Sequence, residues 1–578
     1  MVPLAFMLPL IGAVVCLALD RFVAARLTGL GAAGVLFLCA ILMIVARLQG
    51  LPSTVFDQTW LQWGDASFRI TLIIDPLGWL LALIAFIGGA LALLGSALAI
   101  PPDLRGFGRL FAALIVIPGI AAIGACSPAL PVLAFAPGVV GIAWFVALRS
   151  SGALPGSDAP LVLALSGSAA ALFLLAGLLS DSAGAAPGSS ILMVAGILIY
   201  VWTLCGLPPA FGSLAAAHQA PAPLAVVAPF GLPLIGIVVL LRLLPDYLAL
   251  LEEAYLTVLV ATGILAFVLA AARALWTRSL RQLAAAQFSA QVALIIVCAG
   301  CGNDAFVQVA PALAVNALLS TLGLGLSIAA LERRSGVDDV TALTRHPDSA
   351  LHSATTGLVV AASSAAGIPG AWGFWPRLWL FDAIQRTAPW AVALLLAGSS
   401  LLALAMLAPL VRFWHAAGSS PLQWRAHPGD MLPAFVGALL ALMGAAPRAV
   451  WDVALATIPG QFALTTGMPR FPALPGSIAV IIAALIVIVA PAALRRLRQR
   501  RSPPAEESLT AVLTPDTTGT ALYGLAWLAA PATSEAMHAR LARTALLIRQ
   551  GVAVLGRRYY LAAIVFALIV VILVFAAG

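Results

Sequence analysis

The side chains able to hold or pass on a proton are few in this chain of 578 residues, and most stand at the ends of apolar runs. His218 follows a Gly-Leu-Pro-Pro segment, and an imidazole titrates near neutrality, so this residue could shuttle a proton. A loop or capping role is the alternative that we favour for it. Asp75 precedes Pro76 at the start of an apolar run, where a carboxylate is a natural helix N-cap.

Charged residues also stand near the ends of later apolar runs. Arg242 and Asp246 are four residues apart, a spacing at which side chains pair on a helix. Arg377 follows a Gly-Ile-Pro-Gly segment, and Arg412 follows the next run. For all four we favour an interfacial position, with the long side chains reaching toward water.

The basic residues are all of one kind, since the sequence contains 30 Arg and no Lys. A guanidinium stays charged in essentially any protein setting, so a proton path here needs acids, His or water. No Asp or Glu must lie at mid-membrane, which is a notable lack for a proton carrier. The net charge of +8 does not indicate nucleic-acid binding, because the Arg residues cluster in loops.

The six cysteines do not indicate a metal or redox site. Cys298 and Cys301 have CxxC spacing, but they end an apolar run without a second pair or a nearby His. Packing as small apolar residues is the better interpretation. We therefore expect neither a metal nor a cofactor in this chain.

The elements that must position these residues are membrane helices. The chain is 62% hydrophobic and 9% charged, against about 25% charged in soluble proteins, which excludes a soluble enzyme and a disordered chain. About sixteen apolar runs are long enough to cross roughly 30 Å of hydrocarbon. They are 3–19, 27–46, 76–100, 108–125, 128–147, 159–180, 189–205, 224–243, 254–275, 283–300, 307–330, 353–370, 388–411, 431–447, 473–494 and 559–577.

Three segments outside these runs have distinct patterns. Residues 51–74 alternate in polarity and predict a short hairpin outside the bilayer. Residues 495–530 are basic, then rich in Pro and acids, which indicates a cytoplasmic loop. Residues 534–556 are amphipathic and predict a helix on the membrane surface or, equally, one packed on the bundle. Most of the Arg residues fall in inner loops if the N-terminus is outside, so we expect a multi-pass bacterial cytoplasmic membrane protein with that orientation.

Two apolar runs end in matching breaks, Gly206-Leu207-Pro208-Pro209 and Gly367-Ile368-Pro369-Gly370, and they stand five runs apart. Interrupted helices in corresponding places indicate inverted repeats with a polar site at the breaks. Two ordinary Pro-terminated helices are the alternative.

Several motifs, taken in order, resemble the antiporter-like membrane subunits of complex I, Mrp antiporters and membrane-bound hydrogenases. The segments are DPLGWLLAL (75–83), GLPPAFGSLAAAHQAPAP (206–223), TRSLRQLAAAQFSAQVALI (277–295), VNALLSTLGLGLSIAALERRSGVDDV (315–340) and AAGIPGAWGFWPRLWL (365–380). The tail, with RQG at 549–551 and Tyr559-Tyr560, is most similar to the large antiporter-like subunit (component B) of hydrogenase 4 and formate hydrogenlyase.

The resemblance implies an all-α fold of fourteen core helices with two inverted five-helix repeats and broken helices. It also implies other membrane subunits, a peripheral redox arm and lipid as partners, with no redox cofactor in this chain. The expected divisions are 1–107 (N-terminal helices and hairpin), 108–243 and 254–411 (repeats), 412–494 (C-terminal core helices), 495–558 (loop and amphipathic helix) and 559–578 (last span).

The chain keeps part of the family's polar track and lacks its main relay residues. Asp75, His218, Arg242 and Asn316 match the family, and Arg281 replaces a Lys, with Gln282 replacing the Arg that follows it. The late Lys or Glu of the family has no sure counterpart, and Arg412 is the nearest basic residue. The relay positions that are lost are Ala136 for Glu, Leu204 and Leu234 for Lys (Ile235 with a one-residue gap), Ala317 for His and Thr321 for Lys.

These features favour a non-catalytic subunit of an oxidoreductase complex whose family role is redox-coupled proton translocation. Because apolar side chains cannot exchange protons, we expect its own relay to be impaired and the chain to act largely as a scaffold. The membrane half of a non-redox system, such as inorganic carbon uptake, is the alternative. An unrelated secondary transporter with inverted repeats fits the breaks but not the ordered motifs.

Overall fold

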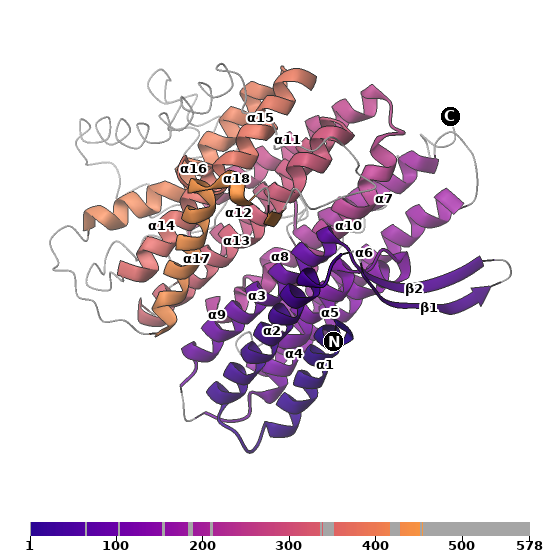
Figure 1. The fold of residues 1–578 in the computed structure, drawn as a ribbon. Coiled ribbons are helices and arrows are strands. Elements are labelled where there is room, and N and C mark those ends of the chain that lie inside the picture. Colours follow the sequence, from indigo (N-terminus) through magenta and orange to yellow (C-terminus); the bar gives the residue numbers. More distant parts are fainter. Residues whose placement is uncertain are drawn as a thin grey trace.

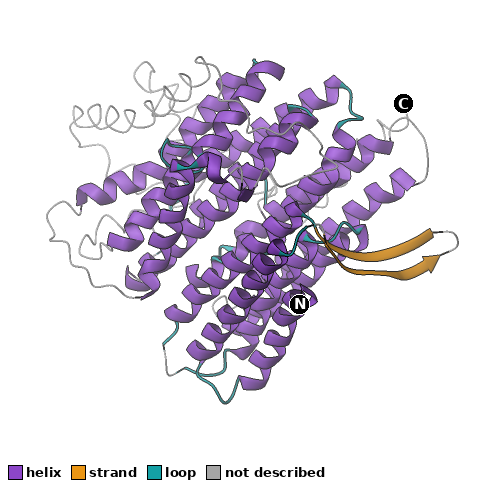
Figure 2. Ribbon diagram, viewed as in Figure 1, coloured by secondary structure: helices purple, strands orange, loops and turns teal. Residues whose placement is uncertain are grey.

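The computed structural model describes residues 2–51, 53–63, 66–101, 104–152, 157–182, 189–208, 212–335, 338, 352–416, 428–450 and 453–454. The expected spans at 473–494 and 559–577, the loop at 495–530 and the amphipathic segment at 534–556 lie outside these residues. Within them the molecule is a bundle of long helices from which one β-hairpin projects (Figures 1 and 2). The predicted all-α membrane fold is confirmed.

The N-terminal part consists of three helices and the hairpin. Strands β1 and β2 pair antiparallel from Ser53 opposite Ile74 to Trp63 opposite Ala66, so the predicted hairpin is confirmed. Asp75 caps the following helix through its side chain, with Pro76 at the first helical position, as the sequence predicts. The elements are α1 (Val2–Leu19), α2 (Ala25–Leu48), β1 (Ser53–Trp63), β2 (Ala66–Ile74) and α3 (Pro76–Ala99).

A first set of helices follows, with one interruption. Successive members pack against one another, and the last packs back on the fourth, α7. The set comprises α4 (Gly108–Ala125), α5 (Leu130–Ser151), α6 (Ala159–Ser182), the interrupted pair α7 (Ser189–Cys205) and α8 (Gly212–Ala217), then the short α9 (Ala222–Ala225), η1 (Ala228–Phe230) and α10 (Leu232–Leu248).

A second set repeats the pattern, again with an interruption in the fourth member. It comprises α11 (Glu253–Trp276), α12 (Leu280–Gly300), α13 (Asn303–Ser335), the interrupted pair α14 (His352–Ala366) and α15 (Phe374–Thr387), and α16 (Ala391–Ala416), after which come α17 (Pro428–Ala445) and α18 (Pro447–Val450). Each set crosses the bundle five times, an odd number, so the second runs in the opposite direction to the first. This is the arrangement of inverted repeats.

Helices α12 and α13 form the centre of the molecule. Every residue of α12 from 283 to 300 is buried. Helix α13 packs on α12 and α14 of its own set and also on α3, α9 and α10, so it joins the two sets. In Figure 1 the purple to magenta first set and the pink to orange second set lie side by side.

Two sequence expectations need correction. The run at 224–243 is not one helix, because Pro229, Gly231 and Pro233 interrupt it and leave α9 and η1 before α10 begins. The sequence also missed α15, whose Arg377 and Asp382 lower its hydropathy below that of a membrane span. The expected ranges for α4 and α7 coincide with the observed helices.

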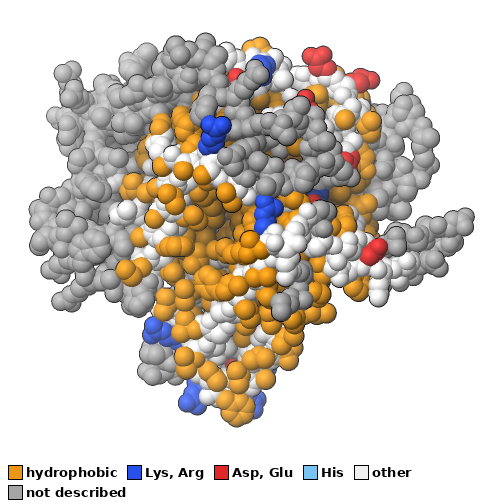
Figure 3. All heavy atoms as spheres, viewed as in Figure 1, with side chains coloured by type: hydrophobic (Ala, Val, Ile, Leu, Met, Phe, Trp, Pro, Cys, Tyr) orange, Lys and Arg blue, Asp and Glu red, His pale blue; other side chains and the backbone are white. Residues whose placement is uncertain are grey.

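The surface agrees with a membrane location. Among the described residues, nine helices are long and apolar enough to cross a bilayer, and five shorter helices are also apolar. Large apolar side chains are exposed along α1, α5, α6 and α11, including Val14, Ile142, Leu172 and Leu265. Figure 3 shows hydrophobic side chains over most of the described surface on this face, with few charged groups among them.

Close packing of α5 on α6 depends on glycine. A Cβ at Gly167 would lie 2.2 Å from the Pro137 carbonyl oxygen, so we expect Gly167→Ala to force the helices apart. The expected loss in the free energy of unfolding is about 1–3 kcal/mol, the usual cost of overpacking. Thermal unfolding of the purified chain in detergent, followed by size-exclusion chromatography, measures it. Gly138→Ala is the matched control, because a Cβ there meets open space; equal losses in both variants would contradict this explanation.

Candidate functional site

The first interruption separates α7 from α8 and leaves backbone carbonyls without helical partners. Gly206 ends α7 in the left-handed conformation with φ of 60°. The Ser213 hydroxyl from α8 donates to the Thr203 carbonyl at 2.6 Å. The Ser289 hydroxyl from α12 donates to the Gly206 carbonyl at 2.8 Å. Side chains on both sides of the interruption therefore satisfy groups that a continuous helix would pair with itself.

The second interruption ends α14 in a Schellman motif around Gly367, which has φ of 76°. Ile368 N donates to the Ser363 carbonyl at 2.9 Å, and Gly367 N donates to the Ser364 carbonyl at 3.1 Å. The next two carbonyls, of Ala365 and Ala366, both accept from the Arg377 guanidinium. All four terminal carbonyls of α14 are thus satisfied.

Arg377 is therefore a buried helix cap and not an interfacial residue. Its side chain is only 4% exposed, so the interfacial position expected for it is wrong. The cause is the backbone at the interruption, where carbonyl oxygens and the negative end of the α14 dipole surround the cation. Its Nε–H has no hydrogen-bond acceptor in the structure.

A row of neutral polar side chains runs from α12 to α13 and α14, and we call it the polar seam. Asn316 Nδ2 donates to Gln291 Oε1 at 3.2 Å, and the Ser364 hydroxyl donates to Asn316 Oδ1 at 2.8 Å. Further along, Gln287 Nε2 donates to the Ser320 hydroxyl at 3.1 Å. The members are Gln287, Gln291, Asn316, Ser320, Thr321 and Ser364, all of them buried.

The seam is polar but has no group that titrates. Thr321, at a lost relay position, lies 3.0 Å from Gln287 Oε1 and 2.6 Å from the Ala317 carbonyl. Amides and hydroxyls hold hydrogen bonds but do not take up a proton near neutral pH. The seam can align helices and any water among them, whereas it cannot store a proton.

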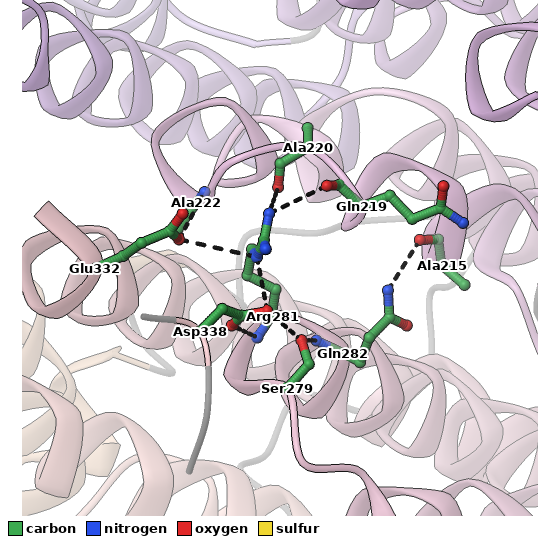
Figure 4. A network of polar contacts seen from close by, with 9 residues as sticks. All are labelled: Ala215, Gln219, Ala220, Ala222, Ser279, Arg281, Gln282, Glu332 and Asp338. Atoms are coloured by element: carbon green, nitrogen blue, oxygen red, sulfur yellow. Dashed lines mark hydrogen bonds and ion pairs between the residues drawn. The ribbon is translucent and has the colours of Figure 1, made fainter. Parts of the chain in front are cut away.

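A cluster of charged residues lies where α12 begins, and we call it the charge cluster (Figure 4). Arg281 Nε lies 2.9 Å from Asp338 Oδ2, and its Nη1 donates to the Ala220 carbonyl at 2.5 Å. Glu332, near the end of α13, accepts from Ala222 N at 3.0 Å. These contacts connect the segment between α8 and α9 to α12 and α13, so the charge cluster holds the two sets of helices together.

His218 lies next to the charge cluster and is buried. Its Nδ1 is 2.9 Å from the Leu214 carbonyl four residues earlier, which agrees with the capping role favoured from the sequence. His218, Arg281 and Thr321 line one small cavity, together with apolar residues of α9 and α13. The structure therefore brings two residues of the predicted polar track, His218 and Arg281, together with the lost relay position Thr321.

Asp75 and Arg242 meet at the opposite end of the bundle. The guanidinium binds the carboxylate through two nitrogens, at 2.6 and 3.1 Å, and also donates to the Ala125 carbonyl at 2.5 Å. The pair thus joins the start of α3 to the ends of α4 and α10. The Arg242–Asp246 pair that the spacing allows does not form, because Asp246 is exposed and Arg242 turns inward toward α3 and α4.

The lost relay positions of the first set carry buried apolar side chains. An added Cβ at Gly124 would lie 3.9 Å from Ile235 Cγ1 and 4.0 Å from Ala136 Cβ. One at Gly236 would lie 3.4 Å from Leu204 Cβ. Leu204 and Ile235 are fully buried, as are Leu234 and Ala317. The lost positions are thus apolar where the family implies proton-exchanging side chains, and the group nearest to an added Cβ at Gly236 is the Cys205 thiol at 2.9 Å.

Other predicted features have no clear place in the site. Arg412 belongs to α16, and its side chain lies outside the described residues. Cys298 and Cys301 are free and buried. No three His, Cys, Asp or Glu side chains gather into a metal site in the parts of the chain that the structure describes.

Residues 213–403, which include both the polar seam and the second interruption, match the family model described as NADH:quinone oxidoreductase/Mrp antiporter, TM. This region is similar to the antiporter-like membrane subunits that the model describes. The resemblance inferred from the ordered motifs is thereby confirmed. No curated protein matches the chain in sequence.

The antiporter-like fold extends over nearly the whole chain. It is similar to a chain in the Mrp complex from Dietzia sp. DQ12-45-1b, with a TM-score of 0.70 and 19% identity. The match covers 96% of this chain and 63% of that one, so this chain spans less than two thirds of the structure it resembles. At this identity the likeness establishes the fold alone.

Several residues of this antiporter-like site were not foreseen from the sequence. Gln287 and Gln291 are the clearest, because two amides one helical turn apart inside an apolar helix are a recognisable signal. Ser289, Glu332 and Asp338 had no comparable signal, since their partners are 57 to 110 residues away along the chain.

We expect Asp75→Ala to destabilise the chain, because it removes both the α3 cap and the partner of Arg242. The cap alone is worth about 1 kcal/mol, and the loss of the paired carboxylate adds to it. Thermal unfolding in detergent measures the change. Asp246→Ala is the matched control, as this acid is exposed on the same helix as Arg242; an equal loss there would contradict the structural role of Asp75.

Arg377→Ala should also destabilise the chain, since the buried Ala366 carbonyl loses its donor at a cost of about 1–3 kcal/mol, while the Ala365 carbonyl keeps Gln291. Arg386→Ala provides the comparison, because the Arg386 side chain is 70% exposed and pairs with Asp382 on the same helix. Unfolding temperatures of the two variants in matched nanodiscs distinguish them. A stable Arg377→Ala variant would show that the cap contributes little.

Proposed function

We propose that this chain is a membrane subunit of a hydrogenase-like or complex I-like assembly and acts there as a scaffold. It holds partner membrane subunits and transmits conformational change, while its own interior does not relay protons. The observation that best supports this is the burial of apolar side chains at the lost relay positions Leu204, Leu234 and Ala136 in the first set of helices. The family resemblance supports membership in such an assembly, and the apolar side chains at the lost relay positions support the scaffold role.

At the lost positions the first set has buried apolar side chains, which cannot hold a proton. A water chain needs polar partners to hold each molecule, and apolar side chains offer none. Among the described residues near these positions, Tyr200 donates its hydroxyl to the Leu133 carbonyl at 2.6 Å. That hydroxyl is thereby committed to the backbone, so it does not restore a path.

The second set is polar but has the wrong chemistry for a relay. The seam contains amides and hydroxyls, and the guanidinium beyond it at Arg377 keeps its proton. His218 can titrate, but its Nδ1 is bound to the Leu214 carbonyl. Glu332 and Asp338 of the adjacent charge cluster are paired with Arg281 at 3.8 and 2.9 Å. A proton reaching His218 therefore finds no acceptor further along the seam.

Partners and location follow from the same proposal. The similar structure from Dietzia is that of an Mrp complex, which supports an assembly of several membrane subunits for this chain as well. A peripheral redox arm, a place in the bacterial cytoplasmic membrane and an outside N-terminus complete the proposal. Exposed apolar side chains on α1 and on α5 are available for lipid or for neighbouring subunits.

The decisive experiment isolates the whole complex through a tag on this chain and reconstitutes it in liposomes. The double variant Gln287→Leu with Thr321→Val removes polar groups from the seam at nearly constant volume. We expect the number of protons translocated per electron to stay unchanged, because the seam conducts none. A lower ratio, with the complex fully assembled, would overturn the scaffold role.

Ser327→Ala is the matched control for this experiment. Ser327 is buried in α13 and donates only to the Gly323 carbonyl four residues earlier, so it lies off the seam. The subunits that copurify test the assembly separately. Iron–sulfur proteins with a large nickel–iron subunit agree with the proposal, whereas a single large zinc protein would favour inorganic carbon uptake.

A further inference from the structure

One helix holds the carbonyl ends of both interrupted helices. From the middle of α12, Ser289 donates to the Gly206 carbonyl at the first interruption at 2.8 Å. Two residues later, Gln291 Nε2 donates to the Ala365 carbonyl at the second interruption at 2.5 Å. Both side chains are buried, with Ser289 1% and Gln291 0% exposed, so no solvent replaces these donors.

The spacing places these two contacts on opposite faces of α12 at nearly the same depth. Two residues correspond to about 200° of rotation and about 3 Å of rise along an α-helix. A rotation of α12 that carries Ser289 away from Gly206 therefore also carries Gln291 away from Ala365. A shift along the axis by one residue breaks both contacts as well.

Further hydrogen bonds connect α12 to the second half of each interrupted helix, directly at the first interruption and through a shared carbonyl at the second. Gln282 Nε2 donates to the Ala215 carbonyl of α8 at 3.1 Å, so α12 holds both halves of the first interrupted helix. At the second, the Ala365 carbonyl accepts from Gln291 and also from Arg377 of α15. The Ala365 carbonyl oxygen at the end of α14 therefore binds both α15 and α12.

We propose that α12 couples the two interrupted helices mechanically, so that a change at one interruption loosens the other. The structure has no direct hydrogen bond between the two sites in the described residues, and the coupling passes through this one rigid, fully buried helix. The inference goes beyond the proposed function, because it holds whether or not protons cross the subunit. It identifies Ser289 and Gln291 as positioning residues for the two interruptions.

Hydrogen–deuterium exchange of the complex in nanodiscs tests the coupling. Peptides covering 199–208 and 361–373 report on the first and second interruptions, whose amides include Leu207 N and Ile368 N. We expect Ser289→Ala to speed exchange in the 361–373 peptide, which it does not touch, by about fivefold or more, as is usual for linked sites. Gln291→Met should speed exchange in the 199–208 peptide by a similar factor, since coupling is reciprocal.

Two variants of the same chemistry serve as controls. Ser327→Ala removes another buried serine hydroxyl from a helix, and Gln287→Met removes another buried amide from α12, but neither residue contacts an interruption. Both should leave the two peptides unchanged. Acceleration confined to the nearer interruption, or equal acceleration by the controls, would overturn the proposal. Should Ser289→Ala fail to fold, Gln291→Met and the milder Ser289→Cys provide the same comparison.

Discussion

A backbone carbonyl released inside a bilayer must find a donor within the protein, because hydrocarbon offers none. Both interrupted helices release such carbonyls, and the interior of this protein is arranged to satisfy them. Ser213 and Ser289 do so at the first interruption, and Gln291, Asn316 and Arg377 do so at the second. Several buried polar side chains of the bundle are therefore accounted for by helix termination before any transport role is considered.

The helices themselves could be predicted from the sequence, because length and hydropathy are local properties. The ranges of α4 and α7 coincide with the apolar runs, and both interruptions fall at the predicted breaks, where Gly206 and Gly367 have positive φ. Helix α15 was missed because its charged residues lower its hydropathy below that of a membrane span. One of them, Arg377, is nevertheless buried, because it donates to backbone carbonyls. The partner of Arg242 could not be predicted either, since Asp75 is 167 residues away and the local spacing favoured Asp246.

The same requirement separates the family residues that this chain keeps from those that it has lost. Asp75 accepts from Gly78 N, Arg242 donates to the Ala125 carbonyl, His218 binds the Leu214 carbonyl and Asn316 donates to the Ser364 carbonyl. Each retained side chain thus hydrogen-bonds to the backbone, although the Leu214 and Ser364 carbonyls also accept from backbone N–H groups. The lost positions of the first set face other side chains, so apolar replacements there pack without loss of such a hydrogen bond.

Arg377 shows how this distinction bears on chemistry. A guanidinium presents several donors in a planar fork, so one side chain can bind the adjacent carbonyls of Ala365 and Ala366 together. An ammonium group at this site would be a compact point charge and could release its proton when buried. Arg377 therefore caps α14 with a group that does not exchange its proton. A chain with no Lys can therefore keep the helix-terminating interactions of an antiporter-like interior while giving up the proton exchange, which is the combination that a scaffold needs.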